Sequence, residues 1–466
     1  MQTVVKTSPT RRWWILATVL IGSLVGTTGN SMMNVALPSI LEDYRAGLDS
    51  GVWIVTIYVL LFSTLMPICG RLGDMFGYRR IYLVGMATLA VWSAAAAFAP
   101  NLGWLIALRA LAGISNAPTL PAVMAIIATT FPANERGGAL GFWATVNAAS
   151  HGAGPVLSGL LVQSFGWPAV FWFNAAVALI GVVMIAACLP SDSRRSREHF
   201  DLVGASTLTG AMILMLFNLT VGLNGSVSLE MNLLLWGACA GLLAAFGFSQ
   251  ARLPHPFVDL RLLKRRAYAA VTLVSGAQLF CLFGLQLLLP QFLRGVQGRS
   301  FAETGLLVAP LALTLAVVSP LAGRLADTVG GRLTCALGMG LVAAAGAGML
   351  FWTAATPVLP LVLTLMALGF GMGLTQSPTA SLVTLVVEKD RLGVALGIFN
   401  MLRFVMGTLG ATVFGVILER GSQIASETLA AFRLDFGLFI AAAAAAALLA
   451  LTLPAPRAHQ TATVEP

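Results

Sequence analysis

Three ionisable residues stand inside long apolar runs of the sequence. Arg109 and Arg403 each lie within such a run, and His151 lies in a third. An ionisable group at the middle of a bilayer costs about 2.5–3.5 kcal/mol, so it must face protein or water. Of the three, only histidine has an ordinary pKa in the physiological range. We expect His151 to carry a coupling proton if one is used; the alternative is a hydrogen-bonded packing residue.

A charged, glycine-rich segment follows the second apolar run. It reads Gly70, Arg71, Leu72, Gly73, Asp74, Met75, Phe76, Gly77, Tyr78, Arg79, Arg80. Glycines allow a tight turn with positive φ and a close approach of helices, and an aspartate at the start of a helix meets a partial positive charge. The segment could form a latch between parts of the protein. It could also be a charged turn that only fixes topology.

The same pattern returns later in the chain. After the tenth apolar run the sequence reads Gly323, Arg324, Leu325, Ala326, Asp327, Thr328, Val329, Gly330, Gly331, Arg332, which is 253 positions after the first copy. Two shorter echoes recur at nearly the same offset, from Leu37 and Pro38 and from the Ala139 to Gly141 run. Repeats at one offset predict two related halves, as in many transporters.

The elements that must position these residues are membrane-spanning helices. The chain has 466 residues, of which 58% are hydrophobic and 10% charged, whereas a soluble domain has roughly a quarter charged. Apolar runs of about twenty residues are long enough to cross a bilayer. We predict an all-α polytopic membrane protein with fourteen spans: 13–36, 51–69, 81–99, 103–129, 137–162, 168–189, 203–222, 231–250, 267–290, 302–323, 332–353, 357–386, 392–418 and 434–453.

The basic residues predict the orientation of these spans. Twenty of the 27 Lys and Arg residues fall in one set of loops and the two tails, and five fall in the opposite loops; the other two are Arg109 and Arg403. Basic residues in short loops stay on the cytoplasmic side. Both termini are therefore expected in the cytoplasm, with the chain in the inner membrane. The net charge of +9 is explained by these loops and does not indicate a nucleic-acid partner.

The repeat and the spans predict the division of the chain. A cytoplasmic tail, 1–12, precedes a six-helix bundle, 13–189; an inserted helix pair, 203–250, precedes a second six-helix bundle, 267–453, and a tail, 454–466. Polar segments on either side of the pair would serve as linkers.

The segment Gly-x-x-x-Asp-x-x-Gly-x-Arg from Gly70 to Arg79 resembles the motif of the major facilitator superfamily. Fourteen spans with a mid-chain pair resemble its drug:proton antiporter branch. So do the run from Asn34 to Pro38 and an antiporter-like motif with Gly154, Pro155 and Gly159. The resemblance implies a major facilitator fold. It also implies a protein that functions as a monomer, binds a small-molecule substrate and exchanges protons.

The resemblance also implies roles for single residues. Asp74, Arg71 and Arg79 would join the two bundles on the cytoplasmic side when the transporter faces outward, and Asp327, Arg324 and Arg332 would serve the second half. Arg109 matches the intramembrane arginine of the branch, which takes part in proton coupling; the alternative is a hub for backbone carbonyls, and Arg403 faces the same choice. Gly154 and Pro155 would form a hinge or a packing kink.

The chain departs from the branch in its first span. Members of the branch commonly have an acidic residue five positions before Asn34, and here that position is Gly29. All 18 acidic residues map to loops or span ends. A cavity with arginines and no carboxylate is electropositive, which disfavours a lipophilic cation and favours a neutral or anionic molecule. Candidate lining residues are Asn30, Asn34, Tyr58, Asn116, Asn147, Gln278, Gln286, Gln376 and Asn400.

These features predict a secondary active transporter that exports drug-like or natural-product molecules in exchange for protons. The missing acidic residue favours the alternative, a facilitator or importer of a neutral or anionic metabolite. The sequence contains no cluster of catalytic or metal-ligating residues within the spans and no phosphate-binding Gly-x-x-x-x-Gly-Lys loop. We therefore expect neither an enzyme nor a cofactor or metal site.

Overall fold

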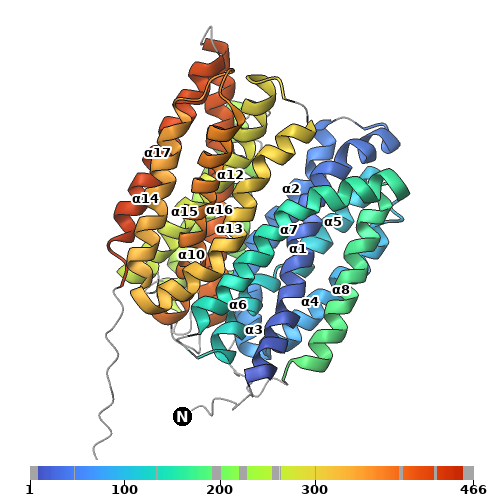
Figure 1. The fold of residues 1–466 in the computed structure, drawn as a ribbon. Coiled ribbons are helices and arrows are strands. Elements are labelled where there is room, and N and C mark those ends of the chain that lie inside the picture. The colour runs from blue at the N-terminus through green and yellow to red at the C-terminus, as the bar shows by residue number, and fades with distance from the viewer. Residues whose placement is uncertain are drawn as a thin grey trace, which may run out of the picture.

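The computed structural model describes residues 9–46, 48–132, 135–190, 201–219, 228–253, 262, 264–299, 301–387, 392–424 and 428–454. Every regular element in these ranges is a helix, as expected from the apolar runs. Figure 1 shows the first half of the chain, blue to green, beside the second half, yellow to red. The fold is therefore an all-helical polytopic one in which two halves lie side by side.

The helices of the first half follow the predicted spans closely. They are α1 (Pro9–Tyr44), α2 (Leu48–Thr64), α3 (Met66–Phe76), α4 (Tyr78–Ala96), α5 (Leu102–Asn116), α6 (Thr119–Thr130), α7 (Arg136–Phe165) and α8 (Pro168–Cys188). The predicted second span is divided between α2 and α3, which meet at a bend of 44°. The fourth is divided between α5 and α6, where Ala117 and Pro118 separate the two helices.

The remaining helices are the inserted pair and the second half. They are α9 (Leu202–Phe217), α10 (Leu229–Arg252), α12 (Arg266–Gly295), α13 (Phe301–Val329), α14 (Gly331–Met349), α15 (Val358–Val386), α16 (Leu392–Ile424) and α17 (Thr428–Ala450). The Asp201 side chain caps α9 by accepting a hydrogen bond from the Gly204 backbone N–H at 2.8 Å. Asn101 caps α5 in the same way.

The segment from Gly70 to Arg80 is a helical corner and not the loop that we expected. Gly70 to Phe76 belong to α3, and α4 begins directly after Gly77, which has a φ of 97°. Gly330, 253 positions later, has a φ of 102° and stands between α13 and α14 in the same way. An L-residue rarely adopts such a φ, so glycine is what allows each corner to be so short.

Not all fourteen predicted ranges fall on helices that are long and apolar enough to span a membrane. Each range lies on a helix or a pair of helices, and among the described residues ten helices are long and apolar enough to cross a membrane, or eleven with the bent pair of α2 and α3. The other three ranges fall on α4, α7 and α9. With 16 residues, α9 is shorter than the roughly twenty that a span needs.

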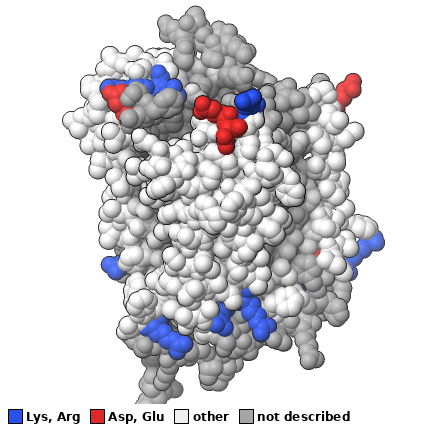
Figure 2. Space-filling model, turned by 90° about the vertical axis from the view of Figure 1, so that its right-hand side faces the viewer, with Lys and Arg blue, Asp and Glu red and all other residues white. Residues whose placement is uncertain are grey.

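The outer surface is that of a membrane protein. On the face drawn in Figure 2, coloured charged residues gather toward the two ends and leave a broad white band between them. Large apolar side chains stand exposed on several helices, among them Leu234 and Phe248 of α10 and Leu313 of α13. Such a surface is unfavourable in water and favourable in lipid, where every helix satisfies its own backbone groups.

The inserted pair occupies one side of the junction between the halves. Buried residues of α9, including Leu208 and Met212, pack in one apolar cluster with Leu60 of α2 and with Ile398 and Met401 of α16. Trp53 of α2 stacks on Phe217 at the end of α9, with ring centroids 5.6 Å apart. In this way α9 contacts both halves, while α10 packs against α9.

Candidate substrate cavity and the contacts that close it

The first contact between the halves joins α3 to the beginning of α16. The Asp74 carboxylate accepts hydrogen bonds from the backbone N–H groups of Gly393, at 3.0 Å, and Val394, at 3.1 Å. These are among the first amides of α16, which have no partner within their own helix and carry a partial positive charge. The Tyr78 hydroxyl also donates to Asp74. We call this contact the first latch.

The second contact joins α13 to the beginning of α7 and repeats the first. The backbone N–H groups of Gly137 and Gly138, in the first turn of α7, donate to the Asp327 carboxylate. The Ser377 hydroxyl of α15 donates to the Gly137 carbonyl at 3.0 Å. We call this contact the second latch. In each latch an aspartate of one half caps a helix of the other half.

Glycines make both latches possible by letting the backbones touch. A Cβ on Gly70 would lie 2.0 Å from the Gly393 carbonyl oxygen, and one on Gly323 would lie 1.9 Å from the Gly137 carbonyl oxygen. Each carbonyl belongs to a helix backbone and cannot rotate away. Even a methyl group at either glycine would therefore push the two halves apart.

The latches correct the predicted role of the helix dipole. We expected Asp74 to meet the positive end of its own helix, but Asp74 lies in the last turn of α3. The positive charge comes from α16, on the other half, because the close glycine contact brings that helix terminus to the carboxylate. A single sequence does not reveal which helix end will face a carboxylate.

The arginines of the two motifs lie in different surroundings. Arg71 is buried beside Asp74 and interacts with it electrostatically. The Arg79 guanidinium donates at 2.8 Å to the Ala186 carbonyl of α8, within its own half. Arg80, Arg324 and Arg332 are exposed. The Arg79 contact thus lies within one half, whereas Arg71 lies at the latch, and a role of Arg79 and Arg332 in joining the bundles stays a prediction.

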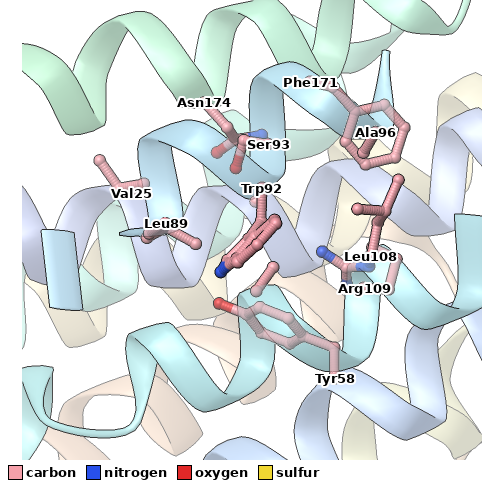
Figure 3. Close-up of a pocket in the computed structure, with 12 residues that line it drawn as sticks. Val25, Tyr58, Leu89, Trp92, Ser93, Ala96, Leu108, Arg109, Phe171 and Asn174 are labelled. Carbon is pink, nitrogen blue, oxygen red and sulfur yellow. The ribbon is translucent and has the colours of Figure 1, made fainter. Parts of the chain in front are cut away.

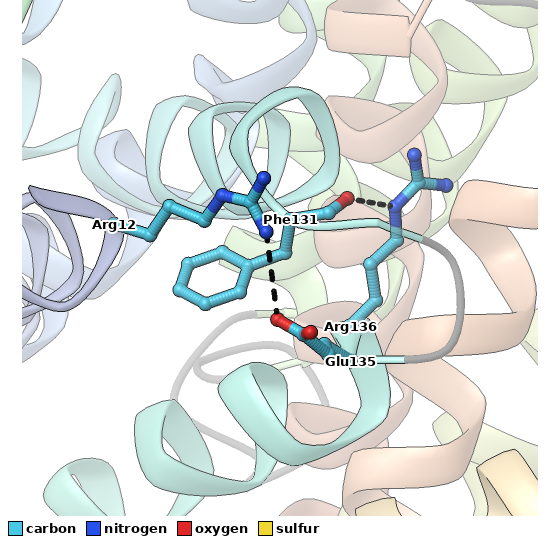
Figure 4. A network of polar contacts seen from close by, with 4 residues as sticks. All are labelled: Arg12, Phe131, Glu135 and Arg136. Carbon is cyan, nitrogen blue, oxygen red and sulfur yellow. Dashed lines mark hydrogen bonds and ion pairs between the residues drawn. The ribbon is translucent and has the colours of Figure 1, made fainter. Parts of the chain in front are cut away.

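A further polar network lies at the same end of the first half. Arg12 of α1 approaches Glu135, just before α7, with an N–O distance of 3.8 Å. The Arg136 Nε donates to the Phe131 carbonyl at 3.1 Å. Figure 4 shows how this network gathers the start of α1, the end of α6 and the start of α7. It fixes the helix terminus that Asp327 caps.

A cavity of about 240 Å³ lies between the two halves. The first half contributes α1, α2, α5, α6 and α7, and the second half contributes α12, α13, α15 and α16. Among the candidate lining residues, those that line the cavity are Asn30, Tyr58, Asn116, Asn147, Gln286 and Gln376, together with Arg403. Aromatic and aliphatic side chains, including Phe62, Trp143, Phe283 and Phe404, form the rest of the wall.

Three candidate residues do not line this cavity or cannot be placed. Asn400 is buried behind it, where its Oδ1 accepts a hydrogen bond from Arg403 Nη1 at 3.2 Å. Gln278 is buried, and its amide atoms have no hydrogen-bond partner in the described part of the chain. The side chain of Asn34 lies outside the residues that the structure describes. We expected aromatic side chains to contribute to the wall, but the sequence did not indicate which ones, because aromatic residues occur throughout these helices.

Arg109 lies in a separate, small pocket next to the main cavity. Its Nε donates at 3.0 Å to the Ile54 carbonyl, and its Cζ lies 4.1 Å from the centroid of the Tyr58 ring. Figure 3 shows Arg109 and Tyr58 side by side at one end of this pocket, with Asn174 and Ser93 at the other. Tyr58 lines both pockets and separates Arg109 from the main cavity.

The comparisons with known proteins agree with this geometry. Residues 19–411 match the family model described as Major Facilitator Superfamily. The chain belongs to the major facilitator superfamily. A relative in this superfamily is the multidrug resistance protein Stp of Mycobacterium tuberculosis, 30% identical over 83% of this chain and 72% of its own length.

One further relative and one solved structure also resemble this chain. The tetracenomycin C resistance and export protein of Streptomyces glaucescens is 30% identical over 88% of this chain and 76% of its own length. The crystal structure of the human organic anion transporter MFSD10 (TETRAN) matches with a TM-score of 0.73 at 18% identity, covering 95% of this chain and 100% of that one. At that identity the structure supports the fold alone.

The position where the drug:proton branch commonly has an acidic residue opens onto Arg109. Gly29 lines the Arg109 pocket, and a Cβ on it would lie 2.8 Å from the Asn174 Oδ1. The neutral amide of Asn174 thus fills the space beside Gly29. Within the described residues, Arg109 Nη2 and Asn174 Oδ1 are buried without hydrogen-bond partners. This chain therefore has the superfamily fold with a neutral amide, that of Asn174, in the pocket of Arg109.

The antiporter-like motif packs α7 against α1. A Cβ on Gly154 would lie 1.8 Å from the Ser31 Oγ, and the Ser158 hydroxyl donates to the Met32 carbonyl at 2.8 Å. Gly159, in contrast, has open space where a Cβ would point. The side chains of His151 and Pro155 lie outside the described residues, so their predicted roles gain no support here. The motif accounts for a close contact between two helices of one half.

One acidic residue lies deeper than the sequence indicated. We placed Asp435 at the end of the last span, but α17 begins at Thr428 and Asp435 is fully buried. Neither carboxylate oxygen has a hydrogen-bond partner in the part of the chain that the structure describes. The neighbouring Phe432, Phe436 and Phe439 are also buried, and this aromatic spacing was the signal that the helix begins earlier.

Proposed function

We propose that this chain is a secondary active exporter of drug-like or natural-product molecules that works by alternating access. The observation that carries the proposal is the pair of latches, which join the halves at one end of a shared cavity. Rocking of the halves about such a cavity opens it to one side at a time. The relatives named for multidrug resistance and for tetracenomycin C export support outward transport.

The latched end is assigned to the cytoplasm of a multi-pass inner-membrane protein. The basic residues of the loops support this, because 20 of the 27 fall on the side that contains both tails and both latches. Opening the latches would admit substrate from the cytoplasm, and closing them would commit it to the outside.

The chain is assigned to the fourteen-span branch of the superfamily. Helices lie on all fourteen predicted ranges, and α9 packs between α2 and α16 as an inserted helix would. The bundles are 13–189 and 267–453, and the pair is 203–250. With its interface between halves contained in one chain, the protein works as a monomer.

Proton exchange drives the export in this proposal. Arg109 and His151 are the candidate coupling residues, since no carboxylate is found among the described residues that line either pocket. A facilitator or importer of a metabolite would need no such coupling. Dependence of transport on an imposed pH gradient separates the two functions.

The test is a transport assay in a drug-susceptible bacterial host. Expression of the chain should lower the accumulation of several structurally different drugs, and a protonophore should reverse the effect. Arg109→Ala should abolish export, while Gly340→Ala, at a glycine with open space around it, should retain it. Unchanged accumulation of every compound, with the protein present in the membrane, would contradict an exporter. Export that ignores the protonophore would contradict proton coupling.

A further inference from the structure

The charge of the main cavity is carried by one side chain. Among the described residues that line it, Arg403 is the one with a charge, and the others are amides, hydroxyl-bearing residues and apolar side chains. No carboxylate stands opposite it among the lining residues that the structure describes. A cavity of this kind attracts anions and has nothing to balance a cation.

Arg403 has hydrogen-bonding capacity that the protein leaves unused. It is 4% exposed, and its Nη1 donates to Asn400 Oδ1 at 3.2 Å. Its Nε is buried and has no partner within the described residues. A guanidinium has five N–H donors in a planar fork suited to a carboxylate. A buried charge with free donors on a cavity wall needs an anionic partner.

Asn400 holds this guanidinium in place. The Asn400 Nδ2 donates to the Leu396 carbonyl at 2.9 Å and approaches the Met124 sulfur of α6 at 3.2 Å. The amide is fixed by these contacts, so its Oδ1 can hold Arg403 from behind. Arg109 differs, because its Nε is bonded to a backbone carbonyl and it stands behind Tyr58.

An aromatic surface adjoins Arg403. The Phe404 ring packs edge-on against Phe62, with centroids 5.4 Å apart, and against Phe283, with centroids 6.1 Å apart. Tyr58 stacks on Phe62 at 6.0 Å. These rings offer apolar contact area to a flat molecule. The amides of Asn30 and Gln376 each leave a buried oxygen without a partner in the described chain, so they can accept bonds from ligand hydroxyls.

We propose that the cavity selects amphipathic organic anions, whose carboxylate or ionised oxygen pairs with Arg403 while an aromatic body packs on Phe62, Phe283 and Phe404. This inference rests on the proposed function and names the substrate class of the same cavity. The volume of about 240 Å³ lies just below the common range of about 300–1,000 Å³ for ligand pockets, which suits a compact ring system.

The test uses dyes that share one xanthene core and differ in charge. Fluorescein is an anion, its methyl ester carries less negative charge, and rhodamine 6G is a cation. Binding to the purified, detergent-solubilised full chain is measured by fluorescence anisotropy. Fluorescein should bind about tenfold or more tightly than rhodamine 6G, with the ester between them, since a charge-assisted hydrogen bond is lost at each step. Equal or tighter binding of the cation would overturn the inference.

Variants assign the preference to Arg403. Arg403→Gln should weaken fluorescein binding about tenfold and leave rhodamine 6G binding unchanged, while Arg403→Lys should retain part of the preference. Phe283→Ala should weaken both dyes. If Arg403→Gln does not fold, the comparison of the three dyes on the parent protein still decides. An unchanged preference in a folded Arg403→Gln protein would also overturn the inference.

The inference and the proposed function fail in different ways. Export of cationic drugs from cells, without binding of anionic dyes, would contradict the substrate class and leave the exporter intact. Selective binding of the anion by a chain that lowers the accumulation of no compound would support the cavity assignment and contradict the exporter.

Discussion

The two latches are built on the same plan but differ in the side chains that support them. In both, an aspartate caps a helix of the other half and two glycines bring the backbones together. The first latch adds the Tyr78 hydroxyl and the buried Arg71, whereas the corresponding positions of the second latch are Gly331 and the exposed Arg324. The second latch has the Ser377 hydroxyl instead. Tyr78 and Arg71 belong to the same half as Asp74 and hold its carboxylate in place, whereas the Ser377 bond itself joins the two halves. We expect the better-supported carboxylate to make the first latch the stronger one.

The largest expected effect comes from filling the glycine contacts. Gly70→Ala and Gly323→Ala should each reduce export at least about tenfold, because the added methyl would overlap a backbone carbonyl that cannot move. Efflux normalised to membrane expression measures the effect. Gly340→Ala is the matched control, with open space at that position. Normal export by both latch variants would show that the close contacts are not required.

Substitution of the two aspartates should show whether the latches differ in strength. Asp74→Asn removes the charge from an aspartate with three hydrogen-bond donors and should shift the balance toward the open cytoplasmic side by about tenfold or more. Asp327→Asn should act in the same direction with a smaller shift. The balance is measured by the rate at which a single cytoplasmic-side cysteine reacts with a membrane-impermeant maleimide in inverted vesicles. An equal shift, or a larger one for Asp327→Asn, would contradict the proposed difference in strength.

The hydroxyl groups give a finer comparison. Tyr78→Phe removes a donor to a charged carboxylate, and Ser377→Ala removes a donor to a neutral carbonyl. The hydrogen bonds removed contribute about 1.5–3 and about 0.5–1.5 kcal/mol respectively, since hydrogen bonds to charged groups are the stronger ones. The same maleimide assay orders the two variants. The comparison fails if Ser377→Ala opens the cytoplasmic side more than Tyr78→Phe does.

The arginines should produce the smallest difference. Arg71→Gln should weaken the first latch, because a buried cation beside Asp74 is lost. Arg324→Gln should leave export within about twofold of the parent, because an exposed charge interacts weakly with its surroundings. Efflux of one dye, followed at several salt concentrations, measures the effect of both substitutions. A large loss for Arg324→Gln would place that side chain at the second latch.

The sequence predicted where helices and corners lie but not which of them touch. The spacing of apolar runs located the long helices, although it left the end of α3 as a loop, and the Gly77 corner has the positive φ that its glycine allowed. The repeat at 253 positions identified both aspartates. Their partners, the first turns of α16 and α7, are set by the packing of one half on the other. That packing is a tertiary property with no local signal in a single sequence.

The cavity was predicted in part because polar residues inside apolar runs are few. Asn30, Asn147 and Gln286 stood out for this reason, and the structure places them on the cavity wall. The separation of Arg109 from Arg403 was not predictable, because it depends on the side of Tyr58 on which each lies. Asp435 was misplaced because the start of α17 was set too late by several residues.

A distance between two spin labels shows whether the latches hold the cytoplasmic side shut. Labels on Phe76→Cys, at the exposed end of α3, and Thr328→Cys, at the exposed end of α13, with the five native cysteines replaced, report the separation of the halves. We expect a short distance for the parent latches and a longer, broader distribution for the Asp74→Asn/Asp327→Asn protein. The same distribution in both proteins would contradict it.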